Sequence, residues 1–178
     1  GRLPIPVVHG LTMGEIANMA NGEGWLKEGR RVNLTVIRCK GYTHQSRYTL
    51  PVAPSPNLPN MLSIYLYPST CYFEATPVSL GRGTDKPFQQ YGHPHMQGSS
   101  YSFTPRSRPG AKNPPQLNRL CHGVDLSSLD PEQVIARGIN LEYVIDAYRN
   151  LNMDDYFFRP FFEKLIGNGT IRQLTEAR

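Results

Sequence analysis

A carboxylate and a guanidinium eight residues apart are the side chains of this sequence best suited to chemistry. Glu74 follows two aromatic residues, and Arg82 lies in the glycine-rich stretch Gly81–Thr84. We expect Glu74 at or near the end of a strand, with Arg82 as its nearest partner across a glycine turn. A guanidinium fixed by a carboxylate can bind a sugar hydroxyl or a carboxylate through its planar fork of donors. The alternative is an ordinary ion pair that ties down a loop.

Further polar side chains lie near this pair, between stiff or glycine-rich stretches of backbone. Four of the nine residues Pro51–Pro59 are proline, which neither a helix nor a central strand accommodates. We therefore expect a stiff, extended segment on the surface or along a cleft. Tyr72 either stacks on a ring or belongs to the core. Glu74 is the candidate catalytic residue, and the candidate substrate-binding residues are Ser55, Asn57, Thr76, Arg82 and Thr84.

The sequence shows no signature of a metal or an organic cofactor, and we expect neither. His93 and His95 flank one proline, but no acidic or cysteine residue lies at a recognised zinc-ligand offset. A Walker loop, a dinucleotide fingerprint and a Gly-x-Ser-x-Gly motif are absent. The three cysteines, Cys39, Cys71 and Cys121, imply no disulfide framework. Cys71 lies in an apolar run and is expected to be a small buried hydrophobe.

Length and composition indicate one globular domain. The chain has 178 residues, of which 16 are glycine and 16 are proline, a content typical of long loops. This composition excludes collagen, a coiled coil and an all-helical bundle. No apolar run of about 18 residues is present, so we expect no membrane-spanning helix.

The net charge of +5 is modest and is not arranged for nucleic-acid binding. The densest basic stretch contains Arg106, Arg108, Lys112 and Arg119, spread among proline and glycine rather than interleaved with aromatic residues. Two interpretations remain for this stretch. It is either a solvated basic loop or a contact for an anionic glycan or phosphate. We expect no nucleic-acid partner.

The elements that must position these residues are predicted to include both helices and strands. Thr12 and Glu15 form a capping box, which begins a helix that ends near Gly22. Strands are expected over 32–39, 100–103 and 121–126, a short helix or strand over 61–66, and otherwise mostly coil over 85–119.

The C-terminal third is predicted to be helical. Asp130 caps a helix that has Pro131 at its first position. Another short helix is expected to end at Gly167, and a last one to start at Thr170. Residues at helical spacing should face the core, namely Leu141, Val144, Ile145, Tyr148 and Leu151. Together, the predicted helices and strands indicate an α+β domain, in which helices pack on a small mixed sheet with long ordered loops.

Three long motifs follow one another through the middle of the chain. Pro54–Pro59 reads Pro-Ser-Pro-Asn-x-Pro, Tyr67–Thr76 contains Tyr-Pro-x-x-Cys-x-Phe-Glu-x-Thr, and Ser79–Phe88 contains Ser-x-Gly-Arg-Gly-Thr-x-x-Pro-Phe. These motifs resemble those of the bacterial exo-β-N-acetylmuramidases. Arg2–Asn21 resembles the opening of the C-terminal domain of that family, and the match continues in order as far as Gly167.

The resemblance implies an enzyme that releases N-acetylmuramic acid from the non-reducing end of peptidoglycan fragments. Such enzymes have a Rossmann-like N-terminal domain, which carries most of the catalytic machinery and the key glutamate, and a C-terminal domain that closes the cleft. Residues 1–178 are then expected to be a single C-terminal domain, without the Rossmann-like domain and inactive alone. The implied partners are muropeptides and the Rossmann-like domain. The expected location is the bacterial envelope, periplasmic or secreted, with the cytoplasm as the alternative.

Some positions depart from the family pattern. Ser69 and Ala75 stand where the family has glycine, Pro77 replaces a polar residue, and Asp85 adds a charge beside Thr84. These changes retain the polar groups but leave the exact sugar open. Two functions of other classes are also open, namely a non-catalytic module that binds peptidoglycan or another glycan, and a protein-interaction domain.

Overall fold

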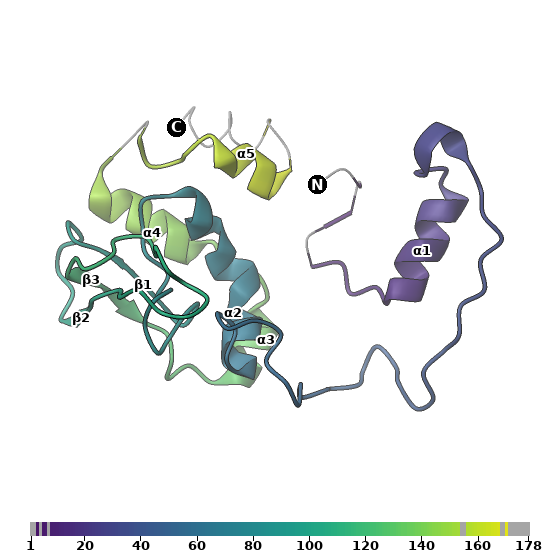
Figure 1. Ribbon diagram of the computed structural model, residues 1–178, viewed down its shortest axis with the longest axis horizontal. Helices are drawn as coiled ribbons and strands as arrows, with labels where there is room; N and C mark the ends of the chain where they lie inside the picture. Colours follow the sequence, from purple (N-terminus) through teal and green to yellow (C-terminus); the bar gives the residue numbers. More distant parts are fainter. Residues whose placement is uncertain (1–2, 4, 7, 154–155, 168–169, 171–178) are drawn as a thin grey trace. The chain divides into compact units, whose positions relative to one another are not determined.

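The computed structural model describes residues 3, 5–6, 8–153, 156–167 and 170. The chain divides into two compact units, Arg2–Thr49 and Leu50–Arg178 (Figure 1). Among the described residues, no helix combines the length and the apolar character needed to cross a membrane.

The smaller unit contains one α-helix and a long extended segment. Helix α1 (Met13–Gly22) begins at Thr12, whose backbone N–H donates to Glu15 Oε2 at 2.8 Å, while the Thr12 hydroxyl accepts from the Glu15 N–H. This confirms the predicted capping box. A 3-10 turn, η1 (Lys27–Gly29), follows. The prediction of a strand over 32–39 was wrong, because these residues have no hydrogen-bonded neighbouring strand in the part of the chain that the structure describes.

The larger unit is built around a small antiparallel sheet with the strand order β1-β3-β2. Its strands are β1 (Gln90–His93), β2 (Tyr101–Phe103) and β3 (Cys121–Asp125). Strands β2 and β3 confirm the prediction, whereas β1 had been assigned to coil. Every residue of β1 is buried, so the strand lacks the alternation that marks a half-exposed strand in a sequence.

Helix α2 (Met61–Thr70) continues into the 3-10 helix η2 (Cys71–Ala75). It begins at Asn60, whose side-chain oxygen accepts from the Ser63 N–H at 2.9 Å. The predicted strand position of Glu74 was wrong, because Glu74 lies in η2. The adjacent aromatics before it were interpreted as strand residues, but the helical turn buries Phe73 and leaves Tyr72 only half-buried.

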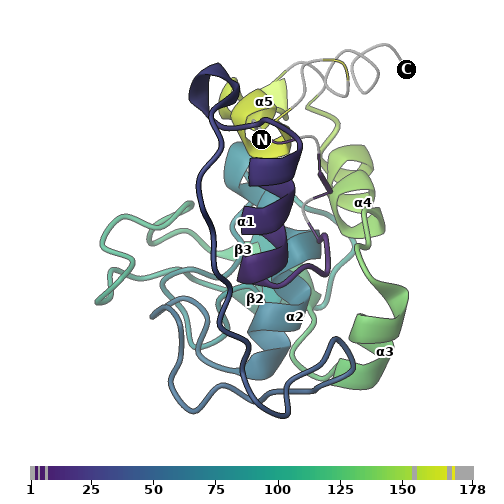
Figure 2. The ribbon, with the colours of Figure 1, turned by 90° about the vertical axis from the view of Figure 1, so that its right-hand side faces the viewer.

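Three helices follow the sheet: α3 (Pro131–Arg137), α4 (Glu142–Leu151) and α5 (Phe161–Ile166). Figure 2 shows α4 and α3 one above the other along one side of the larger unit. The Asp130 side chain accepts from the Glu132 N–H at 3.1 Å, which confirms the predicted cap. Gly167 ends α5 in the left-handed conformation, as expected. Of the helix predicted from Thr170, only Thr170 itself lies within the described residues.

Helix α4 faces the core with fewer residues than predicted. Val144 is buried, and Tyr148 and Leu151 pack partly buried against the core. Leu141 and Ile145 are 50% and 42% exposed, so the expectation that they face the core was wrong. Leu141 is the N-cap that precedes α4, and Ile145 lies about 100° further around the helix than the buried Val144.

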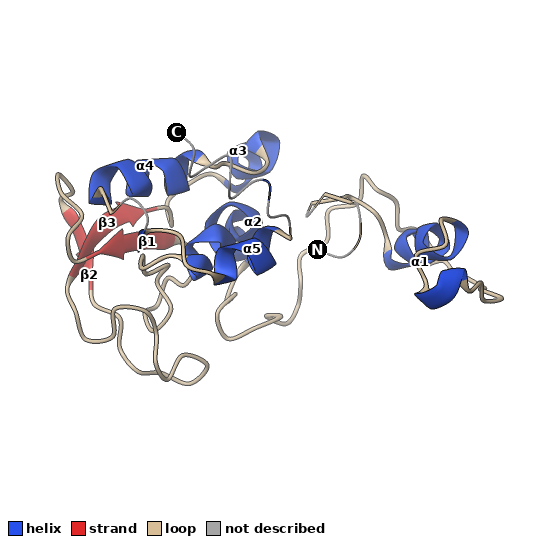
Figure 3. Cartoon of the chain, turned by 90° about the horizontal axis from the view of Figure 1, so that it is seen from above, coloured by secondary structure: helices blue, strands red, loops and turns tan. Residues whose placement is uncertain are grey.

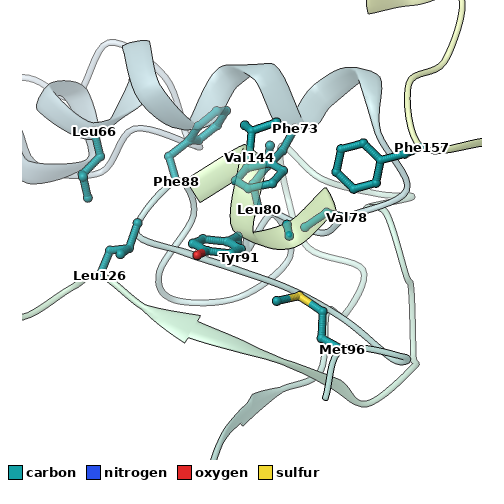
Figure 4. Packing of buried hydrophobic residues seen from close by; sticks show 11 residues of the cluster. Leu66, Phe73, Val78, Leu80, Phe88, Tyr91, Met96, Leu126, Val144 and Phe157 are labelled. Carbon is teal, nitrogen blue, oxygen red and sulfur yellow. The ribbon is translucent and has the colours of Figure 1, made fainter. Parts of the chain in front are cut away.

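The core of the larger unit joins α2, η2, the sheet and α4, and it is rich in aromatic contacts (Figure 4). The Phe73 ring stacks on the Tyr91 ring, with centroids 4.8 Å apart. In Figures 1 and 3 the sheet lies at one end of this unit and α2 at the other. The expected α+β class is confirmed.

Candidate functional site

The predicted pair of Glu74 and Arg82 is formed. Nη2 of Arg82 donates a hydrogen bond to Oε1 of Glu74 and makes an ion pair with it. The Glu74 side chain is 21% exposed and the Arg82 side chain 37% exposed. The pair is therefore neither sealed in the core nor fully solvated.

A tight glycine turn presents Arg82. Gly81 and Gly83 have φ values of 79° and 80°, in the left-handed region that favours glycine. The Thr84 N–H donates to the Gly81 carbonyl oxygen at 3.1 Å, and the Thr84 hydroxyl donates to the same oxygen at 2.6 Å. This turn holds Arg82 between two glycines whose backbone conformation would be strained in a residue with a side chain.

One aromatic ring lies beside the guanidinium, and a second ring packs on the first. Arg82 Cζ lies 5.3 Å from the centroid of the buried Phe88 ring, and Tyr67 packs on Phe88 with centroids 5.0 Å apart. Burial, and then the charge of Glu74, raise the pKa of the Tyr67 hydroxyl. Tyr67 is not among the site residues predicted from the sequence. Tyr67 lies in α2 and Glu74 in the 3-10 helix that follows, so no single helical spacing indicates from the sequence that the two are neighbours.

Nε of Arg82 is buried and has no hydrogen-bond partner among the described residues. Glu74 is the one hydrogen-bond acceptor that the described structure gives this guanidinium. The Arg82 guanidinium is thus a charged donor that pairs with Glu74 on one side. Its other N–H groups, on a partly exposed side chain, can still donate hydrogen bonds.

Ser55 and Asn57 lie in the proline-rich segment, which contains neither a helix nor a strand over 51–59, as predicted. The Asn57 N–H donates to the Ser55 hydroxyl at 3.2 Å, and the Leu58 N–H donates to the Ser55 carbonyl at 2.9 Å. Both polar side chains are half-buried. The Asn57 amide nitrogen also donates to the Gly110 carbonyl at 3.1 Å.

The loop Thr104–Arg119 contacts both candidate segments. The Arg106 N–H donates to the Gly83 carbonyl at 2.9 Å, next to Arg82. Gly110 of the same loop accepts the bond from Asn57. The proline-rich segment and the glycine turn therefore adjoin one shared loop of the larger unit.

Thr76 and Thr84 serve the local backbone. The Thr76 hydroxyl is buried, donates to the Phe73 carbonyl at 2.9 Å and accepts from the Val78 N–H at 3.1 Å. A buried hydroxyl with these two partners fits a structural role for Thr76. Tyr72 is half-buried against the hydrophobic core.

A second polar cluster lies beside the first and was not anticipated. Lys86 Nζ is 2.6 Å from Asp125 Oδ2 and 5.7 Å from the centroid of the Tyr101 ring. The hydrogen bond to Asp125 raises the pKa of Lys86. The Tyr101 hydroxyl donates to Gln90 Oε1, and Gln90 Nε2 donates to the Thr84 hydroxyl at 2.6 Å. The cluster therefore braces the turn that carries Arg82.

His93 lies buried in β1. Its Nδ1 accepts from the His95 N–H at 3.2 Å, and the two rings are 5.3 Å apart. Burial, with His95 and Arg119 acting in the same direction, lowers the pKa of His93 to about 4. Across the described ranges, no group of three His, Cys, Asp or Glu side chains is placed to hold a metal ion.

Two family models match the chain. The model for the C-terminal part of the exo-β-N-acetylmuramidase NamZ matches residues 65–178, and the model for its N-terminal part matches residues 1–62. The first match contains Glu74, Arg82 and the whole sheet. The second extends past the division between the two compact units, which lies between Thr49 and Leu50, so it includes Ser55 and Asn57.

Similar proteins support the same family. The chain is 36% identical over 193 residues to the peptidoglycan β-N-acetylmuramidase NamZ of Bacillus subtilis (strain 168), covering 99% of this chain and 45% of that protein. A crystal structure of a DUF1343 family protein from Bacteroides fragilis NCTC 9343 matches with a TM-score of 0.93 and 66% identity, covering 98% of this chain and 50% of that one.

A second DUF1343 family protein of Bacteroides fragilis NCTC 9343 shares the fold, with a TM-score of 0.72 at 21% identity over 95% of this chain and 49% of its own. The chain thus spans about half the length of the relatives it matches. With the C-terminal family model matching well over half of its residues, the chain belongs to the exo-β-N-acetylmuramidase NamZ family.

Proposed function

We propose that this chain is part of an enzyme that releases N-acetylmuramic acid from the non-reducing end of peptidoglycan fragments. In this proposal the larger unit supplies one wall of the active-site cleft. The name of the Bacillus subtilis relative supports the substrate class. The observation that carries the assignment to this unit is the partly exposed ion pair of Glu74 and Arg82 on the glycine turn.

Hydrolysis of a glycoside generally uses two carboxylic groups on opposite sides of the scissile bond. Glu74 is the candidate on this wall, and the second belongs to a Rossmann-like N-terminal domain on the other wall. With one candidate carboxylate, the chain is inactive alone. Clefts between domains are common places for ligands, which fits a site shared in this way.

The other polar residues position the sugar. Arg82 binds the lactyl carboxylate that distinguishes muramic acid, or it holds Glu74 in place, because a guanidinium forms strong charge-assisted bonds with carboxylates. Ser55 and Asn57 bind sugar hydroxyls or the N-acetyl group. Thr84 keeps the turn closed behind Arg82. This chemistry needs water and protein groups and no cofactor.

Peptidoglycan as the substrate places the protein in the bacterial envelope, periplasmic or secreted. The alternative is the cytoplasm, where imported fragments are recycled. Muropeptides and the Rossmann-like domain are the partners that the proposed site requires.

The test uses the complete protein that carries this chain. Glu74→Gln and Arg82→Ala should each lower the kcat for release of N-acetylmuramic acid by about a hundredfold or more, the scale of a lost catalytic or positioning group. Arg137→Ala is the matched control, because Arg137 makes an exposed ion pair with Glu142 in the same unit. Near-wild-type turnover in a folded Glu74→Gln variant rejects the catalytic role.

A non-catalytic binding module gives a different result. Glu74→Gln then leaves turnover unchanged, while the larger unit still contributes to the affinity for muropeptides. Calorimetric titration of a muropeptide into the complete protein and its variants separates the two outcomes.

A further inference from the structure

More than half of the net charge of the chain lies in one segment. Residues 74–125, which carry the glycine turn and the sheet, contain six of the 19 Lys and Arg residues and three acidic residues, Glu74, Asp85 and Asp125. The rest of the chain has thirteen basic and eleven acidic residues. The segment therefore carries a net charge of +3 out of the +5 of the chain.

Half of these six cations have acidic partners. Arg82 pairs with Glu74, Lys86 with Asp125, and Arg108 with Asp85. These pairs neutralise the positive charge on the turn itself.

The other three cations lie on the loop Thr104–Arg119 and keep their charge. Arg106 donates to the Asn118 side-chain oxygen at 3.0 Å, and Arg119 donates to the Gln116 side-chain oxygen at 3.0 Å, so both partners are neutral amides. Lys112 has no acidic partner among the described residues. All three side chains are exposed. We call this loop, with Arg106, Lys112 and Arg119, the cationic loop.

The cationic loop is held in one conformation by its own backbone. Arg108 and Ala111 exchange two backbone hydrogen bonds, of 2.9 and 3.2 Å. The Asn118 N–H donates to the carbonyl of the buried Pro105 at 2.8 Å, and Gln116 Nε2 donates to the Pro77 carbonyl at 2.7 Å. A loop ordered in this way presents its charges without a large entropic cost on binding.

We propose that the cationic loop binds the carboxylates of the glycan strand beyond the terminal sugar. This inference rests on the proposed function. Each muramic acid whose stem peptide has been removed carries a free lactyl carboxylate, so a peptide-free strand is a chain of regularly spaced negative charges. Arginine and lysine bind such groups, and arginine matches the planar carboxylate in particular. The Arg106 N–H bonds to Gly83, so the loop begins beside the residue proposed to hold the first carboxylate.

Two substrates separate this role from catalysis in the complete protein. One is a disaccharide with a terminal N-acetylmuramic acid, which has a single carboxylate. The other is a peptide-free strand of several disaccharides. The double variant R106Q/K112Q should lower kcat/KM on the strand by about tenfold, as expected for two exposed charge contacts, and should change kcat/KM on the disaccharide by less than about twofold.

The control variant is Arg149→Ala. Arg149 is an exposed cation on α4 of the same unit, and its removal should change neither substrate. Raising the salt concentration should reduce the advantage of the strand more in the wild-type protein than in R106Q/K112Q, because salt screens exposed charges and the double variant keeps only Arg119 of the three.

The inference is overturned if R106Q/K112Q affects both substrates equally or affects neither. It is also overturned if poly(glycerol phosphate) competes with the wild-type loop more strongly than the carboxylate strand does, because the loop then serves a phosphate polymer. A wild-type protein that cleaves neither substrate refutes the proposed function itself. Cleavage of both with no effect of the loop variants refutes only the role of the cationic loop.

Discussion

The guanidinium carbon of Arg82 lies 5.3 Å from the centroid of the Phe88 ring, and the two residues come from the same short turn. Phe88 has a φ of 59°, which is uncommon for a bulky residue. Its N–H donates to the Leu80 carbonyl at 2.8 Å, which closes the turn around Arg82. The aromatic surface under the cation is therefore set by the backbone as well as by side-chain packing.

Replacing Phe88 by leucine should weaken the site. Leucine keeps an apolar group in the buried position but removes the aromatic face, which contributes about 0.5–2 kcal/mol to the position of a cation. We expect kcat/KM for release of N-acetylmuramic acid to fall about three- to tenfold in the complete protein. Steady-state kinetics, with thermal unfolding to monitor the fold, measures this. Unchanged kcat/KM would show that the ring does not position Arg82.

Adding one methyl group at Gly83 should destabilise the larger unit. A Cβ there would lie 2.7 Å from Pro114 Cγ, and closer still to the Arg106 carbonyl oxygen. Overlap and the positive φ together should lower the free energy of unfolding by about 3 kcal/mol. Gly98→Ala is the matched control, because Gly98 has a φ of 76° with nothing within 4 Å, and its cost should be about 1 kcal/mol. Denaturant unfolding measures both, and equal losses would contradict the packing of the cationic loop on the turn.

Stability should fall as the pH drops below neutrality because of His93. Its pKa is lowered to about 4 in the folded state, chiefly by burial, whereas an unfolded histidine titrates near 6.5. Between these values the unfolded chain binds more protons, so stability is complete above about pH 6.5 and is lost as the pH falls towards 4. The loss should reach about 2–3 kcal/mol. Denaturant unfolding at pH 7.5 and pH 5 should show this loss of unfolding free energy, and His93→Asn should make the loss smaller. Equal stability of the wild-type protein at both pH values would be inconsistent with a neutral buried His93.

Two thiols should resist alkylation in the native protein. Burial raises the pKa of Cys71 and of Cys121 to about 11. At pH 8 about one thiol in a thousand would be the reactive thiolate, even before burial limits access. Iodoacetamide should therefore label neither residue until denaturant is added, as peptide mapping by mass spectrometry would show. Rapid native labelling of Cys71 would mean that the end of α2 opens readily.

Features set by neighbouring residues were predictable from the sequence. The caps at Thr12 and Asp130 and the stop at Gly167 depend on one helical turn each. The contact of Glu74 with Arg82 spans eight residues and a glycine turn, and it was also predicted, although Glu74 lies in a 3-10 helix rather than at a strand end.

Features set by distant residues were missed. Strand β1 pairs with β3, whose residues lie 29 to 35 positions further along the chain, and its four buried residues leave no alternation in the sequence. Lys86 meets Asp125 across 39 residues, so local spacing gave no indication of that cluster. For residues 32–39 a strand was predicted where none forms. Their alternation is typical of a strand, but no neighbouring strand pairs with them among the described residues.

The central strand of the sheet comes last in the chain. Both edge strands, Gln90–His93 and Tyr101–Phe103, bond to Cys121–Asp125. A nascent chain that has not yet emerged from the ribosome past residue 125 therefore cannot complete either pairing, however long it waits. The ribosome has to synthesise β3 before β1 and β2 can form their hydrogen bonds. A pause or truncation before β3 therefore leaves two unpaired strands that can associate with the wrong partner.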